Sequence, residues 1–592
     1  MKRISRNGIC FISSFDISHS CSAITTRAYS SCHTNKSVST NGLKINFDNV
    51  RCLYDAVTLF HQMIGTQPLP SVLCFCQLFK TLLTMKHYSA VVSLFREMQK
   101  LGIPINYFIL SILINSYCLM HRADFGFSVL PIYLKNGIPF NVVTFNTLIR
   151  GFFAENKVKD AVDLFKKLVR ENICEPNEVM YAIVMNGLSK RGHTQKSFSL
   201  LRLMEQGNTK PDIKNYSIVI DALCKDGNLH AAINLLNEMK QKSIHPDIVT
   251  YSSLIDGMCR LGQWEKVTSL FAEMVNHNIY PNVRTFNIMI DGLCKEGKVE
   301  DAEEVMKHMV GKSVEPDRVT YNAIMDGYCL RGQLDRARRI FDMMIDKCIE
   351  PNIICYNILI NGHCKKKKLT EAMQFFREIS QKGLNPNIVT YNTILQGMFE
   401  VGRIGGAKKI YVEMLSAGPI PDLYTYRTLL NGYFKYGLVE EAMSLFHKLE
   451  RTREDIDIAF YNVVINGLCK NGKLDEAHAI FEKLSSIGLL PDLRAYTVMI
   501  NGFCLEGLLD EAKDMLRKME DNNCFPNNVT YNVIVQGFLR CNKINEMINF
   551  MKEMAGRGFS FDATTAGFLV NVIRENPSVL DMIPELHLKN KK

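Results

Sequence analysis

Apolar residues recur along this chain in pairs of stripes, each with the spacing of one face of an α-helix. In the segment 248–282 the first stripe has five members at i, i+3, i+4, i+7 and i+8: Tyr251, Leu254, Ile255, Met258 and Cys259. Gly262 interrupts the pattern, a second stripe follows, and Pro281 prevents further helix. The segment is therefore predicted to fold as a hairpin of two helices.

This pattern returns every 35 residues. Pro-Asp or Pro-Asn pairs mark the period, for example at 211–212, 246–247 and 281–282. Fourteen repeats fit between Val72 and Asp562, with one extra residue in repeat 3. One hairpin cannot bury both of its stripes, so neighbouring hairpins are predicted to stack into an all-α solenoid.

The pattern divides the chain into four expected regions. They are a leader over residues 1–40, a degenerate half repeat over 41–71, the array of fourteen repeats over 72–562, and a partial repeat with a tail over 563–592. The leader holds ten serines and five basic residues against one acid, Asp16, which is typical of an organellar targeting segment. The alternative is a disordered terminus that carries no targeting signal.

Composition and charge narrow the function classes. With 47% hydrophobic and 22% charged residues, the chain is expected to fold, and it has no apolar window long enough to insert into a membrane. The leader carries +4 of the formal net charge of +10, because it has five basic residues and one acid. The array is only mildly basic, so charge alone does not establish a nucleic-acid partner.

Within each repeat we number places from its first residue, so that Ile248 is place one and Asn282 is the last place. Places four, seven, eight, eleven and twelve form the predicted buried stripe. Eight cysteines occupy place twelve: Cys118, Cys224, Cys259, Cys294, Cys329, Cys364, Cys469 and Cys504. They are spread along the array and no CxxC pair occurs, so we expect core residues, no metal site and no cofactor.

A second helix face carries recurrent polar residues. Place five holds Asn, Ser or Thr in eleven repeats: Ser111, Asn146, Ser217, Ser252, Asn287, Asn322, Asn357, Asn392, Asn462, Thr497 and Asn532. The last places of those repeats are Asn141, Asn177, Asp247, Asn282, Asp317, Asn352, Asn387, Asp422, Asp492, Asn527 and Asp562. Only Cys76, Ala182 and Arg427 depart from the pattern at place five.

Two further places complete this face. Place two is often aliphatic: Val143, Val179, Val249, Val319, Ile354, Val389 and Val529. Place thirteen carries a cation in eight repeats: Lys190, Lys225, Arg260, Lys295, Lys365, Lys435, Lys470 and Arg540. The cations could contact phosphates or could be ordinary solvated helix charges, and the sequence leaves both interpretations open.

Helix capping is the structural alternative for the last place, because Asp or Asn before a helix satisfies free backbone N–H groups. Capping does not explain place five, where Asn and Ser weaken a helix interior. It does not explain an aliphatic residue beside the core stripe either. We therefore favour a series of groups that read base edges, with aliphatic side chains between bases and cations near phosphates.

The repeat length and the runs 248–257 and 389–397 resemble pentatricopeptide repeats of the P class. The leader and the segment 65–71 resemble the restorer-of-fertility-like branch of plant mitochondria. This resemblance implies a right-handed superhelix that binds single-stranded organellar RNA, one nucleotide to each repeat. It also implies that the fifth and last residues choose the base and that the second residue wedges beside it. A mitochondrial address is implied, with the chloroplast as the alternative.

The family code, applied from the N-terminus toward the RNA 3′ end, gives an expected target. Ser or Thr with a last Asn favours A, Ser with Asp favours G, Asn with Asp favours U, and Asn with Asn favours C or U. The expected string is ?-A-Y-?-G-A-U-Y-Y-U-?-U-A-U, where Y is a pyrimidine. The repeats of Cys76, Ala182 and Arg427 give the three unassigned letters.

No catalytic constellation is recognisable. The acidic residues recur along helix surfaces instead of clustering, as hydrolysis of RNA would require, so we expect a binding protein without enzymatic activity. A recruited nuclease or processing factor would then act on the bound transcript. The competing hypotheses are a tetratricopeptide-like scaffold that binds protein segments and an endonuclease active on its own.

Overall fold

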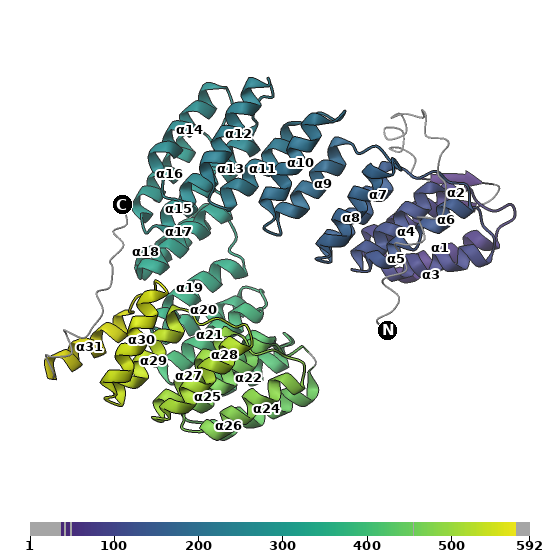
Figure 1. Cartoon of the computed structure of the whole chain (residues 1–592). Coiled ribbons are helices and arrows are strands. Elements are labelled where there is room, and N and C mark those ends of the chain that lie inside the picture. Colours follow the sequence, from purple (N-terminus) through teal and green to yellow (C-terminus); the bar gives the residue numbers. More distant parts are fainter. Residues whose placement is uncertain (1–36, 41–42, 48–49, 454, 576–592) are drawn as a thin grey trace. The chain divides into compact units, whose positions relative to one another are not determined.

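The computed structural model describes residues 37–40, 43–47, 50–453 and 455–575. Most of the expected targeting leader and the end of the expected tail lie outside these residues. The chain forms two bodies, residues 1–292 and 293–592, and each is described by itself. Figure 1 shows both as rows of helical hairpins that follow one another in sequence order.

The first helix of every repeat begins at place one, as the apolar pattern predicts. These helices are α2 (Val72–Thr84), α4 (Tyr107–Leu119), α7 (Val142–Ala154), α9 (Glu178–Ser189), α11 (Ile213–Lys225), α13 (Ile248–Arg260), α15 (Val283–Lys295), α17 (Arg318–Arg331), α19 (Ile353–Lys365), α21 (Ile388–Val401), α23 (Leu423–Lys435), α25 (Ile458–Lys470), α27 (Leu493–Leu505) and α29 (Asn528–Arg540). Another helix, α31 (Ala563–Glu575), begins the partial repeat, and α1 (Leu53–Gly65) precedes the array.

A second helix completes each hairpin. These helices are α3 (Tyr88–Lys100), α5 (Ala123–Phe127) with α6 (Leu130–Lys135), α8 (Val158–Arg170), α10 (Thr194–Gln206), α12 (Leu229–Gln241), α14 (Trp264–Asn276), α16 (Val299–Gly311), α18 (Leu334–Asp346), α20 (Leu369–Gln381), α22 (Ile404–Ala417), α24 (Val439–Thr452), α26 (Leu474–Ser486), α28 (Leu509–Asp521) and α30 (Ile544–Gly556). Within each body, first helices pack on their own partners and on the first helix of the next hairpin, as α11 does on α12 and α13 and as α19 does on α20 and α21. The expected all-α solenoid is confirmed.

The predicted stripe is the core. In repeat 6 the side chains of Tyr251, Leu254 and Ile255 are fully buried, and Met258 and Cys259 are nearly so. The cysteines of place twelve are buried as expected, and burial raises the pKa of thiols such as that of Cys224 to about 12. Among the described residues, no three His, Cys, Asp or Glu side chains come together as a metal site.

Two local features differ from the regular pattern. Strands β1 (Ser37–Thr40) and β2 (Leu43–Asn46) pair antiparallel before the array, which the helical periodicity does not predict. In repeat 2 the second helix is divided into α5 and α6, and Pro131 lies in the first turn of α6, where its ring cannot continue a preceding helix. Over residues 50–453 and 455–575, no helix has the length and apolar character that crossing a membrane requires.

Candidate nucleic-acid interface

The last residue of each repeat is the N-cap of the next first helix. In repeat 5, Oδ1 of Asp247 accepts hydrogen bonds of 2.9 Å from both the backbone N and the hydroxyl of Thr250. Asn527 makes the same two contacts with Thr530, at 3.0 and 3.1 Å. The capping alternative therefore describes a real contact. Capping also orients these side chains, because the backbone N–H requires an acceptor and so turns the oxygen of Asn toward the helix and its NH₂ group away.

Place five is more deeply buried than its position beside the stripe suggests. Only 6% of Asn392, 2% of Asn462 and 1% of Asn532 is exposed to solvent. Its amide reaches the last residue of the same repeat, thirty residues along the chain. The Nδ2 atom of Asn462 donates to Oδ1 of Asp492 at 3.0 Å, and the corresponding bond from Asn392 is 3.5 Å long.

Other repeats bring the two predicted places together in related ways. Asn357 donates from Nδ2 to Oδ1 of Asn387 at 3.4 Å. Asn532 accepts instead, through Oδ1, from the backbone N of Asp562 at 2.9 Å. Asn287 lies in the body 1–292 and Asp317 in the body 293–592.

Several place-five amides keep an oxygen without a partner. Over the described residues, four such Oδ1 atoms are buried with no hydrogen bond: those of Asn146, Asn322, Asn392 and Asn462. A buried acceptor without a donor costs free energy, so such atoms are unusual in a folded protein. Their recurrence at one place of the repeat shows that the buried amide oxygen is a regular feature of the array.

Place three is a polar position that the sequence pattern did not single out. Threonine recurs there, and the side chains of Thr250, Thr285, Thr390 and Thr530 are fully buried. The hydroxyl of Thr250 lies 2.7 Å from that of Ser217 in the preceding repeat, and Thr530 lies 2.9 Å from Thr497. Thr390 donates to Oδ1 of Asn357 at 2.8 Å. The available signal was that each Ser or Thr at place five is followed by Thr at the next place three.

Place two is exposed despite its apolar side chains. The exposed fraction lies between 38% and 58% for the seven predicted residues Val143, Val179, Val249, Val319, Ile354, Val389 and Val529. Leu73, Phe108 and Tyr424 occupy the same place and are also exposed. These side chains add little to the core and are open to contact with a partner.

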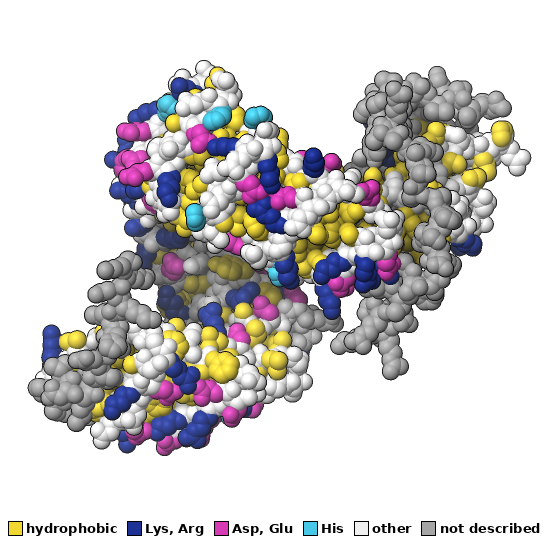
Figure 2. Space-filling model, turned by 45° about the horizontal axis from the view of Figure 1, so that its top comes forward, with side chains coloured by type: hydrophobic (Ala, Val, Ile, Leu, Met, Phe, Trp, Pro, Cys, Tyr) yellow, Lys and Arg dark blue, Asp and Glu magenta, His cyan; other side chains and the backbone are white. Residues whose placement is uncertain are grey.

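The place-thirteen cations are all exposed: Lys190, Lys225, Arg260, Lys295, Lys365, Lys435, Lys470 and Arg540. Lys225 forms a 2.6 Å ion pair with Asp221, and Arg260 forms a 2.9 Å pair with Asp256, one turn earlier on the same helix. Basic and acidic side chains lie interspersed over the face drawn in Figure 2. The two ion pairs fit the solvated-charge interpretation for these members.

The exceptions at place five differ from one another. Cys76 donates from its thiol to Oδ1 of Asn106 at 3.4 Å, and Ala182 is buried. The side chain of Arg427 is 30% exposed, and its Nη1 lies 3.8 Å from Oδ2 of Asp457, the last residue of repeat 11.

Comparison with known proteins identifies the repeat. A model of the PPR repeat family matches eleven segments, which overlap except between 435 and 456: 141–181, 176–225, 212–260, 248–295, 285–329, 316–365, 351–396, 386–435, 456–505, 495–540 and 526–573. A second PPR repeat model matches residues 424–452. Together these matches cover well over half of the chain.

Two curated relatives come from Arabidopsis thaliana and are named as mitochondrial pentatricopeptide repeat-containing proteins. One, described as putative, is 38% identical over 110 residues, which are 19% of this chain and 18% of the relative. The other is 35% identical over 118 residues, 20% of this chain and 22% of the relative. The matches thus span about a fifth of each relative.

Solved structures of the pentatricopeptide repeat protein PPR10 from maize are also similar. One is 22% identical with a TM-score of 0.45 and covers 89% of this chain and 88% of that chain. PPR10 in complex with an 18-nt psaJ RNA element is 21% identical with a TM-score of 0.43, over 89% and 87% of the two chains.

Proposed function

The chain belongs to the pentatricopeptide repeat (PPR) family, and we propose that it binds single-stranded RNA in a sequence-specific manner, one nucleotide to each repeat. It is a P-class member of the restorer-of-fertility-like branch and acts in plant mitochondria. By occupying one transcript it controls processing, stability or translation of that RNA, and a nuclease recruited to the complex makes any cut.

The orientation of the capped last residue is the observation that carries this proposal. Capping takes one oxygen of Asp and leaves the other for a ligand, and it leaves Asn with its NH₂ group outward. Uracil N3–H and guanine N1–H require an acceptor, which Asp supplies, whereas N3 of cytosine and N1 of adenine require a donor, which Asn supplies. The last place therefore divides the four bases into two pairs for a chemical reason.

Place five supplies the second distinction. Ser217, Ser252 and Thr497 are small and leave room for a purine, whereas the larger Asn side chain fits a pyrimidine. The size of place five and the hydrogen-bonding group of the last place together assign a base to each regular repeat. In repeat 9 the outward NH₂ group of Asn387 favours cytosine over uracil. These assignments support the string derived from the family code.

The remaining places fit a threaded strand. Exposed aliphatic residues at place two, such as Val249 and Val389, can lie against the faces of successive bases. Cations at place thirteen can approach phosphates. A tetratricopeptide-like scaffold that binds a polypeptide is the second candidate, but it requires no matched pair at the fifth and last places.

The test is base preference at single nucleotides. The full chain is titrated with 14-nucleotide RNAs of the expected sequence, each changed at one position. Asn392→Thr should shift the preference at nucleotide 10 from U toward G, because Thr leaves space for a purine while Asp422 still accepts from N1–H. The wild-type chain with the same RNA set is the control. Equal binding of RNAs with permuted base order, or an unchanged preference in the variant, would contradict the proposal.

A further inference from the structure

We propose that repeat 11, whose place five is Arg427 instead of Asn, Ser or Thr, binds a guanine base in a cavity beside α23. The inference rests on the proposed function and assigns a letter that the family code leaves open. The expected string then becomes ?-A-Y-?-G-A-U-Y-Y-U-G-U-A-U.

The cavity follows the exposed face of α23. It has a volume of about 410 Å³, and its lining includes Tyr424, Arg427 and Asn431 of α23, with Ala459 of α25 and Arg494 of α27. Ala459 is the smallest residue at place two anywhere in the array. It leaves space between Tyr424 and Arg494, where most other repeats carry a branched side chain. The small side chain of Ala459 and the aromatic ring of Tyr424 thus both border the cavity.

Arg427 brings hydrogen-bond donors to this cavity. Its Nε donates to the carbonyl of Leu423 at 3.3 Å, and its Nη1 lies 3.8 Å from Oδ2 of Asp457, beyond hydrogen-bond distance. Within the described part of the chain, the terminal nitrogens of Arg427 form no hydrogen bond. A guanidinium group with four such N–H groups in a fixed fork favours two neighbouring acceptors.

Guanine is the base that offers this arrangement. Its O6 and N7 atoms lie side by side and accept the two N–H groups of an arginine fork. Its N1–H, next to O6, can then donate to Oδ2 of Asp457, since Oδ1 of that residue already caps α25 through the backbone N of Phe460 at 2.9 Å. Uracil offers O4 without a neighbouring acceptor, and adenine and cytosine place an amino group where guanine has O6.

Lys435 and Arg494 also line the cavity and can take a phosphate, but the carboxylate of Asp457 argues against a phosphate on Arg427 itself. A phosphate held by Arg427 would lie close to Asp457, a second negative charge that is only 3.8 Å from Nη1. A neutral base that both accepts and donates satisfies the two side chains together. The ring of Tyr424, which is 52% exposed, provides a face for stacking.

The first experiment needs no variant. Binding of the full chain is measured with 14-nucleotide RNAs that differ only at nucleotide 11, which is G, inosine, 7-deazaguanine, A, U or C. Inosine keeps O6, N7 and N1–H and should bind about as tightly as G. 7-Deazaguanine lacks N7 and should bind about tenfold more weakly, as should the other three bases. A G preference that ignores N7 would exclude the arginine fork.

Two variants test the residue itself. Arg427→Asn creates the Asn-Asp pair of repeats 10 and 12, so the preference at nucleotide 11 should change from G to U while the other positions keep theirs. Arg427→Lys should abolish the difference between G and 7-deazaguanine, because an ammonium group has no planar fork. Thermal unfolding of each variant, compared with wild type, shows whether it folds.

The outcomes separate this inference from the proposed function. If the other positions discriminate bases and nucleotide 11 does not, the guanine site is wrong and sequence-specific binding stands. Arg427→Ala could weaken the binding of every RNA equally and reduce by about one the number of counterions released on binding, as measured from the salt dependence of the affinity. Arg427 would then contact a phosphate, and the inference would be wrong. If no position discriminates, both proposals fail.

Discussion

The side chain of Asp247 meets two requirements at once. One carboxylate oxygen caps α13 through Thr250, and the other remains available to a partner. The cap gives the side chain a fixed direction without using all of its hydrogen-bonding capacity. Capping and base recognition are therefore compatible functions of one residue, and the cap prepares the group that the base would meet.

Thr250 joins this cap to the preceding repeat, and its hydroxyl has only one proton. Thr250 donates its proton to the carboxylate of Asp247, and Ser217 donates its own to the carbonyl of Ile213 at 2.8 Å, so the two hydroxyls lie 2.7 Å apart in one polar cluster. Thr250→Val should remove the Thr250 hydroxyl from this cluster and lower the free energy of unfolding by about 1–2 kcal/mol. It should also weaken the preference for G at nucleotide 5.

The measurement is urea denaturation together with RNA competition at that nucleotide. Thr250→Ser is the matched control, because it keeps the hydroxyl and should retain the base preference. If Val and Ser variants show the same preference for G, the hydroxyl does not position the base-contacting pair.

The sequence predicted that place five is polar, and the structure shows these side chains largely buried, with contacts to the last residue or to the threonine of the next repeat. Place three was not predictable in the same way. Threonine carries both a methyl and a hydroxyl group, so a search for apolar stripes or for polar positions does not detect the buried Thr250 or Thr390. The cavity at Arg427 depends on Tyr424, Ala459 and Arg494, which come from three different repeats and meet only when the hairpins stack.

Close helix packing depends on small residues at place ten. A Cβ atom added to Gly257 would lie 2.7 Å from Cβ of Cys224 and 2.9 Å from its Sγ, on the neighbouring first helix. Gly257→Ala should therefore force α11 and α13 apart and destabilise the array by about 1–3 kcal/mol.

The control for this change is Gly405→Ala in α22, where an added Cβ meets nothing within 4 Å. There the better helix propensity of Ala should be neutral or stabilising, by up to about 1 kcal/mol. Thermal unfolding of the two variants compares them directly. Equal stability of both would show that the first helices tolerate a wider spacing.

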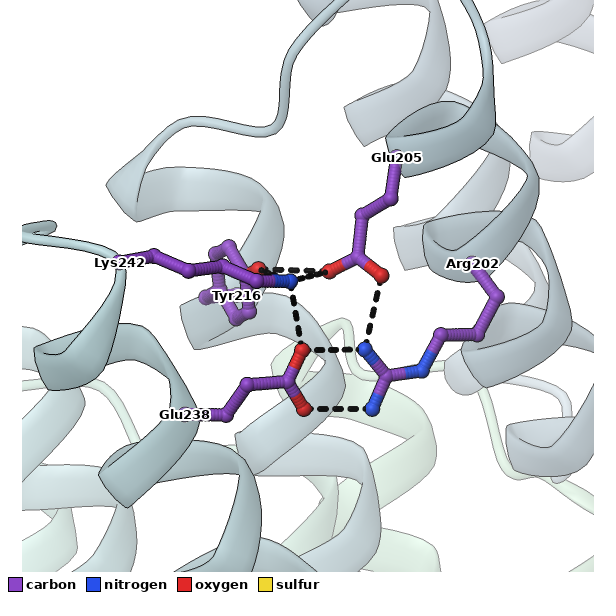
Figure 3. Close-up of polar contacts among 5 residues, drawn as sticks. All are labelled: Arg202, Glu205, Tyr216, Glu238 and Lys242. Atoms are coloured by element: carbon purple, nitrogen blue, oxygen red, sulfur yellow. Dashed lines mark hydrogen bonds and ion pairs between the residues drawn. The ribbon is translucent and has the colours of Figure 1, made fainter.

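The second helices are linked by an ion-pair network between repeats 4 and 5, drawn in Figure 3. Arg202 of α10 donates from Nη2 to Oε2 of Glu238 of α12 at 2.6 Å. Lys242 lies between Glu238 and Glu205, at 2.7 and 2.8 Å, and Tyr216 donates to Glu205 at 2.6 Å. The hydrogen bond from Arg202 is the largest cause that lowers the pKa of Glu238, to about 2.

This shift predicts a pH dependence with a definite sign. A carboxyl whose pKa is lower in the folded state stabilises the fold above its ordinary pKa of 4.5 and loses that contribution as the pH falls to about 2. At pH 6 the free energy of unfolding of wild type should exceed that of Glu238→Gln by about 1 kcal/mol, a value reduced for solvent screening. The difference in free energy should disappear near pH 2. Urea denaturation across this range measures it, and a difference independent of pH would contradict it.

The helix boundaries could be predicted from the sequence wherever the 35-residue repeat and the helical spacing of apolar residues were both regular. Each first helix begins at place one because Asp or Asn caps it and an apolar stripe follows. The division of the second helix of repeat 2 was not predicted, although Pro131 is present in the sequence. Packing against neighbouring helices decides whether a helix continues past a proline, and the sequence alone does not show that packing. The strands over 37–46 lie outside the repeat and share none of its signals.

At the scale of the whole molecule, the fold is a one-dimensional array. Within each body a hairpin packs on the hairpins before and after it, so stability and recognition are both sums over neighbouring repeats. The array has only a modest positive charge, and its basic residues are interspersed with acidic ones. Electrostatic attraction alone is therefore a weak explanation for RNA binding. Under the proposed function, the order of the repeats along the array would carry the specificity.

Removal of one complete repeat tests this property. Deletion of residues 353–387 joins Asn352 to Ile388, which begins α21 as Ile353 begins α19, so Asn352 should cap the new neighbour through the backbone N of Thr390. The array should fold, and RNA selected from random pools should lose the ninth letter while the other letters keep their order. Deletion of 370–387 is the control, because it leaves a helix without its partner and should abolish folding. A selected sequence that still has both pyrimidines of repeats 8 and 9 would show that the repeats do not count nucleotides one by one.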